Sequence, residues 1–101
     1  MKLVYVPFPS EEELEDVAEE ALERNLAACV NRFPIGSMYL WKGETEREDE
    51  VVGLFKTAED RRKELEEFLE ERHPYEVPAI IGLEADVNGS YRDYMGEELE
   101  G

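Results

Sequence analysis

Sulfur and imidazole are scarce in this chain, which has one cysteine and one histidine among its 101 residues. A single cysteine cannot form an internal disulfide, so the fold does not depend on an oxidising compartment. One histidine also excludes a site built from several imidazoles. A metal site within one chain would have to complete that single imidazole with other ligands, such as carboxylate oxygens.

Positive charge is the second shortage. The sequence has eleven Lys and Arg residues and 27 Asp and Glu residues, which gives a formal net charge of −16. Nucleic acids and anionic membranes are bound through Lys and Arg, so both are excluded as partners. Divalent cations are the partners that such a surface favours. The acidity also has two simpler readings, a solvated shell that maintains solubility and adaptation to a salt-rich cytoplasm.

Long hydrophobic runs are absent. The apolar run at Met1–Val6 is too short for the core of a signal peptide, and no segment approaches transmembrane length. We therefore expect a cytoplasmic protein, with residues 1–101 forming one domain.

Catalytic patterns are missing as well. There is no nucleophile elbow for Ser-His-Asp chemistry and no Gly-rich phosphate loop after a strand. Most carboxylates fall on predicted helix faces or a hairpin tip, where solvent surrounds them, whereas acid catalysis needs a pair across a cleft. The sequence therefore predicts a protein that is not an enzyme.

The first half of the chain alternates strand, helix and hairpin. Residues 3–8 form an apolar run that predicts a buried strand, and Ser10 followed by Glu13 is a capping box for a helix to about Asn25. Residues 26–42 predict a long strand with a bulge or bend near Pro34, because proline cannot donate a ladder hydrogen bond. Gly43 or its neighbours turn the chain, residues 44–50 form an exposed tip, and residues 51–55 return as the third strand.

The second half repeats the order. Thr57 predicts the cap of a second helix that ends near Arg72, and residues 78–87 predict the fourth strand. A short helix follows Asn88, and the acidic tail after Gly96 is expected to be frayed. This order predicts an α+β fold, a ferredoxin-like βαββαβ sandwich with a long hairpin and a short C-terminal helix.

One feature of this architecture bears on function. Two helices cover one face of the sheet, yet the hairpin carries Met38, Tyr39, Leu40 and Trp41, which point to both faces. An exposed apolar patch of this kind marks an interface, and open hairpin edges invite pairing with another chain. We therefore expect self-association.

Several short motifs carry a family resemblance. They are Leu26-Ala27-Ala28-Cys29-Val30-Asn31, Ser37, Tyr39-x-Trp41, Phe55-Lys56-Thr57 and His73-Pro74-Tyr75-x-Val77-Pro78. In this order and at these intervals the chain resembles the CutA divalent-cation-tolerance family from about Val4 to Tyr94. The resemblance implies a homotrimer and a role in tolerance of divalent metal ions such as copper.

The metal candidates are His73 and Glu76. Imidazole suits copper and zinc, and a nearby carboxylate could complete a mixed site. The alternative for His73 is structural, since histidine near a helix C-terminus can bond the last carbonyls. The resemblance implies that some relatives bind copper through a first-strand cysteine and a pair of histidines. This chain has Val6 near the place of that cysteine and Arg72 at the place of the first histidine. Copper or zinc is therefore expected to bind weakly.

A second set of candidates suits a ligand cleft between subunits, namely Tyr39, Trp41, Lys56 and Tyr91. Lys56 either contacts an anion or ligand there or forms an ion pair. Cys29, expected mid-strand among small apolar residues, is interpreted as structural. The resemblance thus favours weak cation binding by a trimer. The alternatives are a regulatory module like the PII signalling proteins, which bind small ligands in clefts between subunits, and a purely structural trimer.

Overall fold

A computed structural model describes residues 1–100 of the protein. Strands and helices follow the order β1 (Lys2–Phe8), α1 (Glu11–Glu23), β2 (Cys29–Trp41), β3 (Glu44–Thr57), α2 (Glu59–Arg72), β4 (Ile81–Glu84) and α3 (Gly89–Glu100). The four strands form one sheet in the order β2-β3-β1-β4, and each pair of neighbours is antiparallel. The predicted α+β sandwich with a long hairpin is confirmed.

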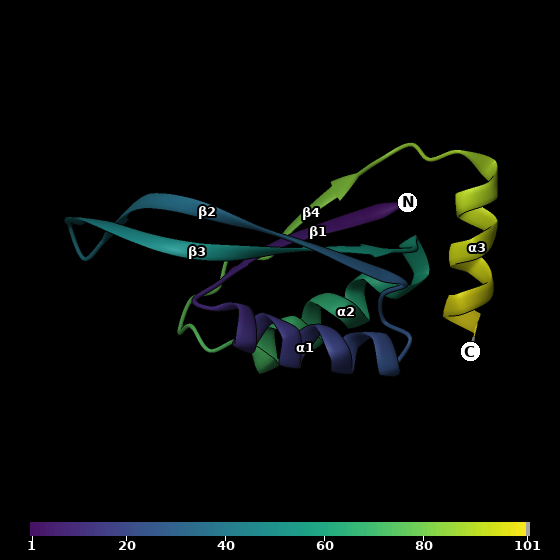
Figure 1. The fold of residues 1–101 in the computed structure, drawn as a ribbon, viewed down its shortest axis with the longest axis horizontal. Coiled ribbons are helices and arrows are strands. Elements are labelled where there is room, and N and C mark those ends of the chain that lie inside the picture. Colours follow the sequence, from purple (N-terminus) through teal and green to yellow (C-terminus); the bar gives the residue numbers. More distant parts are fainter. Residues whose placement is uncertain (101) are drawn as a thin grey trace.

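The helices cover only part of this sheet. Figure 1 shows α1 and α2 side by side against one face, with α3 standing beyond one end and the β2–β3 hairpin projecting at the other. Alternate residues of β1, Val4, Val6 and Phe8, are fully buried on the helix side. The opposite side, which we call the open face, has no helix of residues 1–100 packed across it. No helix in this part of the chain is long and apolar enough to cross a membrane.

Local chemistry explains where α1 begins and ends. The Ser10 side chain accepts a hydrogen bond from the Glu13 backbone N–H at 3.3 Å, as the capping motif predicts. The helix closes at Asn25, whose positive φ of 56° suits the left-handed position after a helix. The Asn25 side chain also donates to the Glu98 carbonyl at 2.7 Å, which ties α1 to α3.

The hairpin differs from the sequence prediction in two ways. The pairing runs without interruption from Cys29–Lys56 to Trp41–Glu44, so no bulge occurs at Pro34. Proline is tolerated there because β2 is an edge strand. Residues 44–50, predicted as an exposed tip, are paired strand, and the turn is only Lys42 and Gly43, both with positive φ. A two-residue turn of this type matches the twist of the strands.

Three other boundaries need correction. The α2 cap is Ala58, with no side-chain hydrogen bond, because the Thr57 hydroxyl is buried and donates to the Leu26 carbonyl at 2.7 Å. The fourth strand is Ile81–Glu84 only, since it pairs with the first four residues of β1. The tail after Gly96 continues as helix α3, because Met95 and Leu99 are buried.

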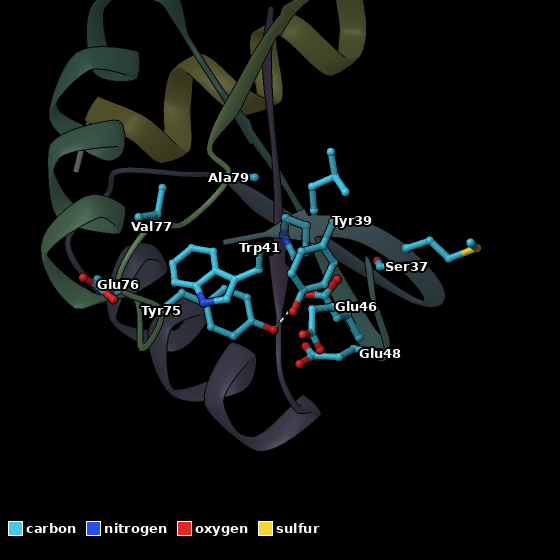
Figure 2. A pocket seen from close by; sticks show the side chains of 13 residues that line it. Ser37, Tyr39, Trp41, Glu46, Glu48, Tyr75, Glu76, Val77 and Ala79 are labelled. Atoms are coloured by element: carbon cyan, nitrogen blue, oxygen red, sulfur yellow. Dashed lines mark hydrogen bonds between the residues drawn. The ribbon is translucent and has the colours of Figure 1, made fainter. Parts of the chain in front are cut away.

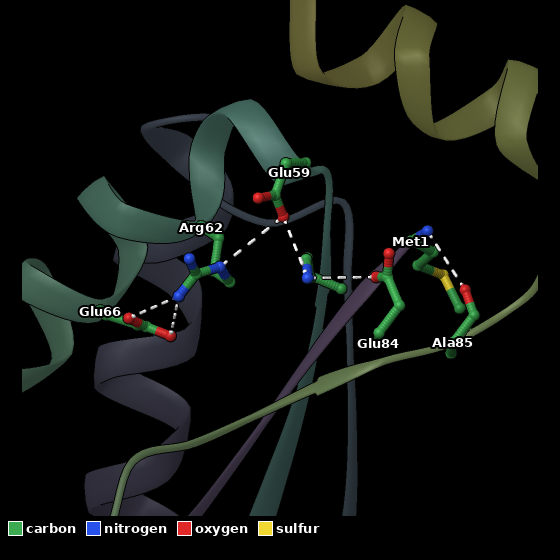
Figure 3. A network of polar contacts seen from close by, with 7 residues as sticks. Met1, Glu59, Arg62, Glu66, Glu84 and Ala85 are labelled. Carbon is green, nitrogen blue, oxygen red and sulfur yellow. Dashed lines mark hydrogen bonds and ion pairs between the residues drawn. The ribbon is translucent and has the colours of Figure 1, made fainter.

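A polar network joins α2 to the sheet on the helix side (Figure 3). Lys2 lies 3.1 Å from Glu59 and 3.3 Å from Glu84, so one ammonium links α2 to β4. Arg62 contributes hydrogen bonds of 3.1 and 3.0 Å to the two carboxylate oxygens of Glu66. Glu59 and Glu84 are largely exposed, so these pairs fix orientation more than they stabilise.

Candidate functional site

His73 caps the C-terminal end of α2 and is buried, with 7% of its surface exposed. Its Nδ1 accepts a hydrogen bond from the Tyr75 backbone N–H at 3.0 Å. The ring proton therefore resides on Nε2, which donates to the Pro7 carbonyl at 2.7 Å. The ring also stacks on Phe8 with centroids 4.4 Å apart. Both nitrogens are thus engaged in holding the chain after α2 against β1.

Burial lowers the pKa of His73 below its ordinary value of 6.5. The hydrogen bond to Pro7 and the carboxylates of Glu13, Glu50 and Glu70 oppose this shift without cancelling it. A neutral imidazole with no free lone pair cannot bind a metal ion in this conformation. These contacts favour the structural alternative for His73, and its use as a metal ligand stays a prediction.

This environment predicts a pH dependence of stability. Because the folded pKa of His73 lies below the unfolded value, the unfolded chain binds more protons as the pH falls through about 6.5, and stability is lost below that point. The wild type should lose up to about 1.4 kcal/mol of unfolding free energy per pH unit relative to His73→Gln. Denaturant titrations from pH 8 to 5 at constant salt measure both. Parallel curves would show that the imidazole does not titrate differently on folding.

Tyr75 connects this region to the hairpin. Its hydroxyl donates to the Glu50 carboxylate at 2.6 Å, and Glu50 is buried. Burial together with this acidic partner raises the pKa of Tyr75, so the phenol stays protonated and remains a donor. The sequence offered no signal that one glutamate among many in residues 44–50 would be buried and bonded to a tyrosine 25 positions away.

Beside this pair lies a groove of about 720 Å³, the hairpin groove, lined mainly by Tyr39, Trp41, Glu46, Glu48, Tyr75 and Val77. Figure 2 shows the side chains of Trp41, Tyr75 and Tyr39 in the groove, with the carboxylates of Glu46 and Glu48 on the same side as Tyr39. Burial, and then the hydrogen bond to Glu48, raise the pKa of Tyr39. The groove is aromatic within and acidic at its rim.

The predicted partner of His73 lies elsewhere on this rim. Glu76 is exposed and lines the groove, but Figure 2 shows it on the far side of Trp41 from Glu46 and Glu48. Within residues 1–100, no three His, Cys, Asp or Glu side chains are grouped to hold a metal ion.

Lys56 and Tyr91 lie at the opposite end of the sheet. The Lys56 ammonium lies 5.3 Å from the centre of the Tyr91 ring. Tyr39 and Trp41 belong to the far half of the hairpin, so one chain does not bring the four predicted cleft residues together. A cleft containing all four requires two copies of the chain.

Cys29 is the first residue of β2, whereas the sequence predicted that it would lie mid-strand. Its side chain is partly buried. Burial and a hydrogen bond with the Cys29 thiol raise the pKa of Tyr91 to about 12. This contact helps to place α3 at the end of the sheet, where Tyr94 also donates to the Ala28 carbonyl at 3.3 Å. A structural role for Cys29 stays a prediction.

Comparison with known proteins adds the family. The model of the CutA1 divalent ion tolerance protein family matches residues 2–98. The chain belongs to the CutA family. The divalent-cation tolerance protein CutA of Thermotoga maritima is 43% identical over 100 residues, covering 98% of this chain and 99% of that protein. CutA proteins are tolerance proteins and not enzymes, in agreement with the sequence prediction.

Two solved CutA structures share the fold. A CutA from Archaeoglobus fulgidus, described as a periplasmic divalent cation tolerance protein, has a TM-score of 0.93 at 33% identity, covering 98% of this chain and 99% of that one. A CutA from Nostoc sp. PCC 7120, described as PII-like and solved in apo form, has a TM-score of 0.84 at 36% identity, covering 95% and 91%. The fold and long hairpin are therefore those of CutA.

Proposed function

We propose that this CutA protein acts in tolerance of divalent metal ions, copper among them, as a homotrimer that binds cations weakly and catalyses no reaction. The observation that carries the proposal is the family match over residues 2–98. The acidic rim of the hairpin groove and the net charge of −16 supply the attraction for cations.

Apolar exposure supports the trimer. Met38 and Leu40 are 67% and 75% exposed, and Trp41, Ile81 and Leu83 are partly exposed. Isolated chains with this much exposed apolar surface on one sheet and hairpin are expected to associate. The trimeric state itself comes from the resemblance to CutA.

The cation sites of this proposal are carboxylates. Because the imidazole of His73 is engaged, Glu46 and Glu48 on one side of the groove and Glu76 on the other are the available oxygens. Carboxylates without an imidazole or thiolate hold copper and zinc weakly. The His73 imidazole can bind a cation only if the hydrogen bond from the Tyr75 backbone N–H to its Nδ1 breaks. A cation site formed by His73 and Glu76 together is therefore less favoured than a site formed by carboxylates alone.

Calorimetric titration with Cu²⁺ and Zn²⁺ at neutral pH tests these sites. Replacing both Glu46 and Glu48 by Gln should weaken binding severalfold, and Glu76→Gln should have a smaller effect because that carboxylate stands alone. His73→Gln should leave binding nearly unchanged, since the ring offers no lone pair.

The matched control removes two exposed charges elsewhere, as in Glu19→Gln with Glu23→Gln on α1. Equal weakening in the groove and control variants would mean that overall acidity, and no site, attracts the metal. Loss of metal binding in His73→Gln alone would show that the imidazole is a ligand in the wild type.

The second candidate is a regulatory module that binds a small ligand. The observations favouring it are the aromatic groove and the description of the Nostoc relative as PII-like. Thermal-shift measurements with a panel of small metabolites test it, and stabilisation lost in Tyr39→Ala would support this reading. If neither metals nor metabolites bind, a purely structural trimer is what remains.

The compartment is part of the proposal too. A single thiol, with no disulfide to protect, suits a reducing cytoplasm. Because the Archaeoglobus relative is described as periplasmic, cell fractionation decides between the two locations.

A further inference from the structure

Asn88 and Gly89 form an Asn-Gly pair where the chain leaves β4 and enters α3. The backbone carbonyl of Asn88 accepts the first bond of the helix, from the Arg92 N–H at 3.1 Å, so Asn88 is the N-cap and Gly89 is the first helical residue. Both residues are exposed to solvent. Asparagine is a thermolabile residue, and a glycine after it leaves the next backbone nitrogen unshielded by a side chain. This pair is therefore the place in the chain where the side-chain amide is most open to attack by the backbone.

The backbone does not require glycine at position 89. Gly89 is not among the glycines with positive φ. A Cβ atom there would meet a terminal guanidinium nitrogen of Arg92 at 3.8 Å, which is an ordinary van der Waals distance. Alanine would therefore fit at this position without strain and would favour the helix. The structural effect of the glycine is to leave its own nitrogen accessible.

The attacking nitrogen has no hydrogen-bond acceptor. The first N–H groups of a helix have no partner within the helix. Among the described residues 1–100, the Gly89 N–H donates no hydrogen bond. The nitrogen becomes a nucleophile when it loses its proton, and the negative charge that then develops is stabilised by the positive end of the helix dipole. The guanidinium of Arg92, which lies beside Gly89, stabilises the same charge.

The leaving group is held in place as well. The Nδ2 of Asn88 donates to the Ser90 hydroxyl oxygen at 2.9 Å, which keeps the side-chain amide beside the start of the helix. When the bond from Cγ to Nδ2 breaks, the departing nitrogen needs a proton. The Ser90 hydroxyl is within hydrogen-bond distance and can supply that proton.

From this arrangement we propose that Asn88 is a site of spontaneous deamidation, with the Gly89 nitrogen as nucleophile and Ser90 as proton donor to the leaving group. Hydroxide removes the Gly89 amide proton, the nitrogen bonds to Asn88 Cγ, and the bond from Cγ to Nδ2 breaks to release ammonia. Ser90 regains its proton from water, and a cyclic succinimide remains. Water then opens the ring. Cleavage of the new bond to Cγ gives an aspartyl residue, and cleavage of the original peptide bond gives an isoaspartyl residue.

The two products affect α3 differently. The aspartyl form keeps the main chain and places a carboxylate at the positive end of the helix dipole, which is favourable. The isoaspartyl form adds a methylene group to the main chain and displaces the carbonyl that accepts from Arg92. The first turn of α3 carries Tyr91, whose ring centre lies 5.3 Å from the Lys56 ammonium. The isoaspartyl form therefore loosens the attachment of α3 to the end of the sheet.

Incubation of the full chain at mildly alkaline pH and physiological temperature tests the proposal. Peptide mapping by mass spectrometry follows the asparaginyl, aspartyl and isoaspartyl forms of position 88 over time. Asn25 and Asn31 are internal controls, because leucine and arginine follow them in the sequence. Position 88 should convert at least about tenfold faster than either control, which corresponds to a modest difference in barrier height.

Variants at the two neighbouring positions separate the parts of the site. Gly89→Ala should slow the conversion at least about tenfold, because its methyl group shields the nitrogen. Its circular dichroism should match that of the wild type, since the Cβ atom fits. Ser90→Ala should slow the conversion severalfold, and Ser90→Thr, which keeps the hydroxyl, should retain the wild-type rate. An unchanged rate in Gly89→Ala would overturn the succinimide route, and an unchanged rate in Ser90→Ala would overturn the role of the hydroxyl.

The same chain unfolded in urea shows what the fold contributes. A native rate within about tenfold of the unfolded rate supports a site that the fold leaves open. Conversion in the unfolded chain with position 88 intact in the native chain would overturn the proposal, because the helix cap would then protect the amide.

The effect on α3 has its own control. Asn88→Asp carries the added charge without the extra methylene group, so hydrogen exchange in α3 should be faster in the isolated isoaspartyl form than in this variant. Equal exchange in the two would contradict the loosening of α3 and leave the deamidation itself supported.

Discussion

Gly53→Val should destabilise the fold by about 3 kcal/mol or more, the expected penalty of overpacking a core that cannot expand. A Cβ atom at Gly53 would lie 2.5 Å from Leu14 Cδ1 and 3.0 Å from Phe55 Cε1. Both neighbours are fully or almost fully buried, so neither side chain can move aside freely. Glycine at this position lets α1 approach β3. Denaturant titration followed by circular dichroism measures the loss.

Gly36→Val is the matched control. Gly36 also lies in the hairpin strands, but a Cβ atom there meets nothing within 4 Å. Valine favours strand geometry, so this variant should be neutral or slightly stabilising. Adding Leu14→Ala to Gly53→Val should cost less than the sum of the two single changes. Strict additivity would show that the contact with Leu14 is not what excludes a side chain at Gly53.

Trp41→Glu should disrupt the proposed trimer, raising its dissociation constant at least 100-fold, as for removal of a central aromatic contact. The indole lies in the hairpin groove and is only partly exposed, and Glu44 is paired directly opposite it. A carboxylate at position 41 would replace apolar contact area and add repulsion between charges. Light scattering at micromolar concentration measures the assembly.

Trp41→Phe separates packing from general damage to the hairpin. It keeps an aromatic ring, so its dissociation constant should stay within about tenfold of the wild type. Because Trp41 lies near the end of the hairpin, the monomer should remain folded in both variants. An unchanged mass for Trp41→Glu would place this residue outside the interface.

The sequence predicted the elements best where local chemistry decides them. The bond from Glu13 to Ser10 is made within one turn, so a local motif was sufficient to predict the start of α1. The early start of β3 was missed because Glu44 and its neighbours have low strand propensity. Their strand is imposed by pairing with the apolar half of β2 across a two-residue turn.

The site was harder to predict because its contacts join distant parts of the chain. His73 was singled out correctly as unusual, but its partner at Pro7 lies 66 residues away, and no local pattern reveals it. Thr57 has the residue type of a helix cap, yet its hydroxyl is used by Leu26. Tyr39 and Lys56 were assigned to a cleft between subunits, and the length of β3 places them at opposite ends of one chain, so that assignment stays a prediction.

The position of Trp41 has a practical consequence. It is the only tryptophan in the chain, and it lies in the hairpin groove. Excitation at the red edge of the indole absorption band would therefore excite Trp41 and not the five tyrosines, so the fluorescence would come from this one location. Its emission wavelength and its quenching by iodide or acrylamide report whether the groove is wet or covered. No dye has to be attached to follow events there.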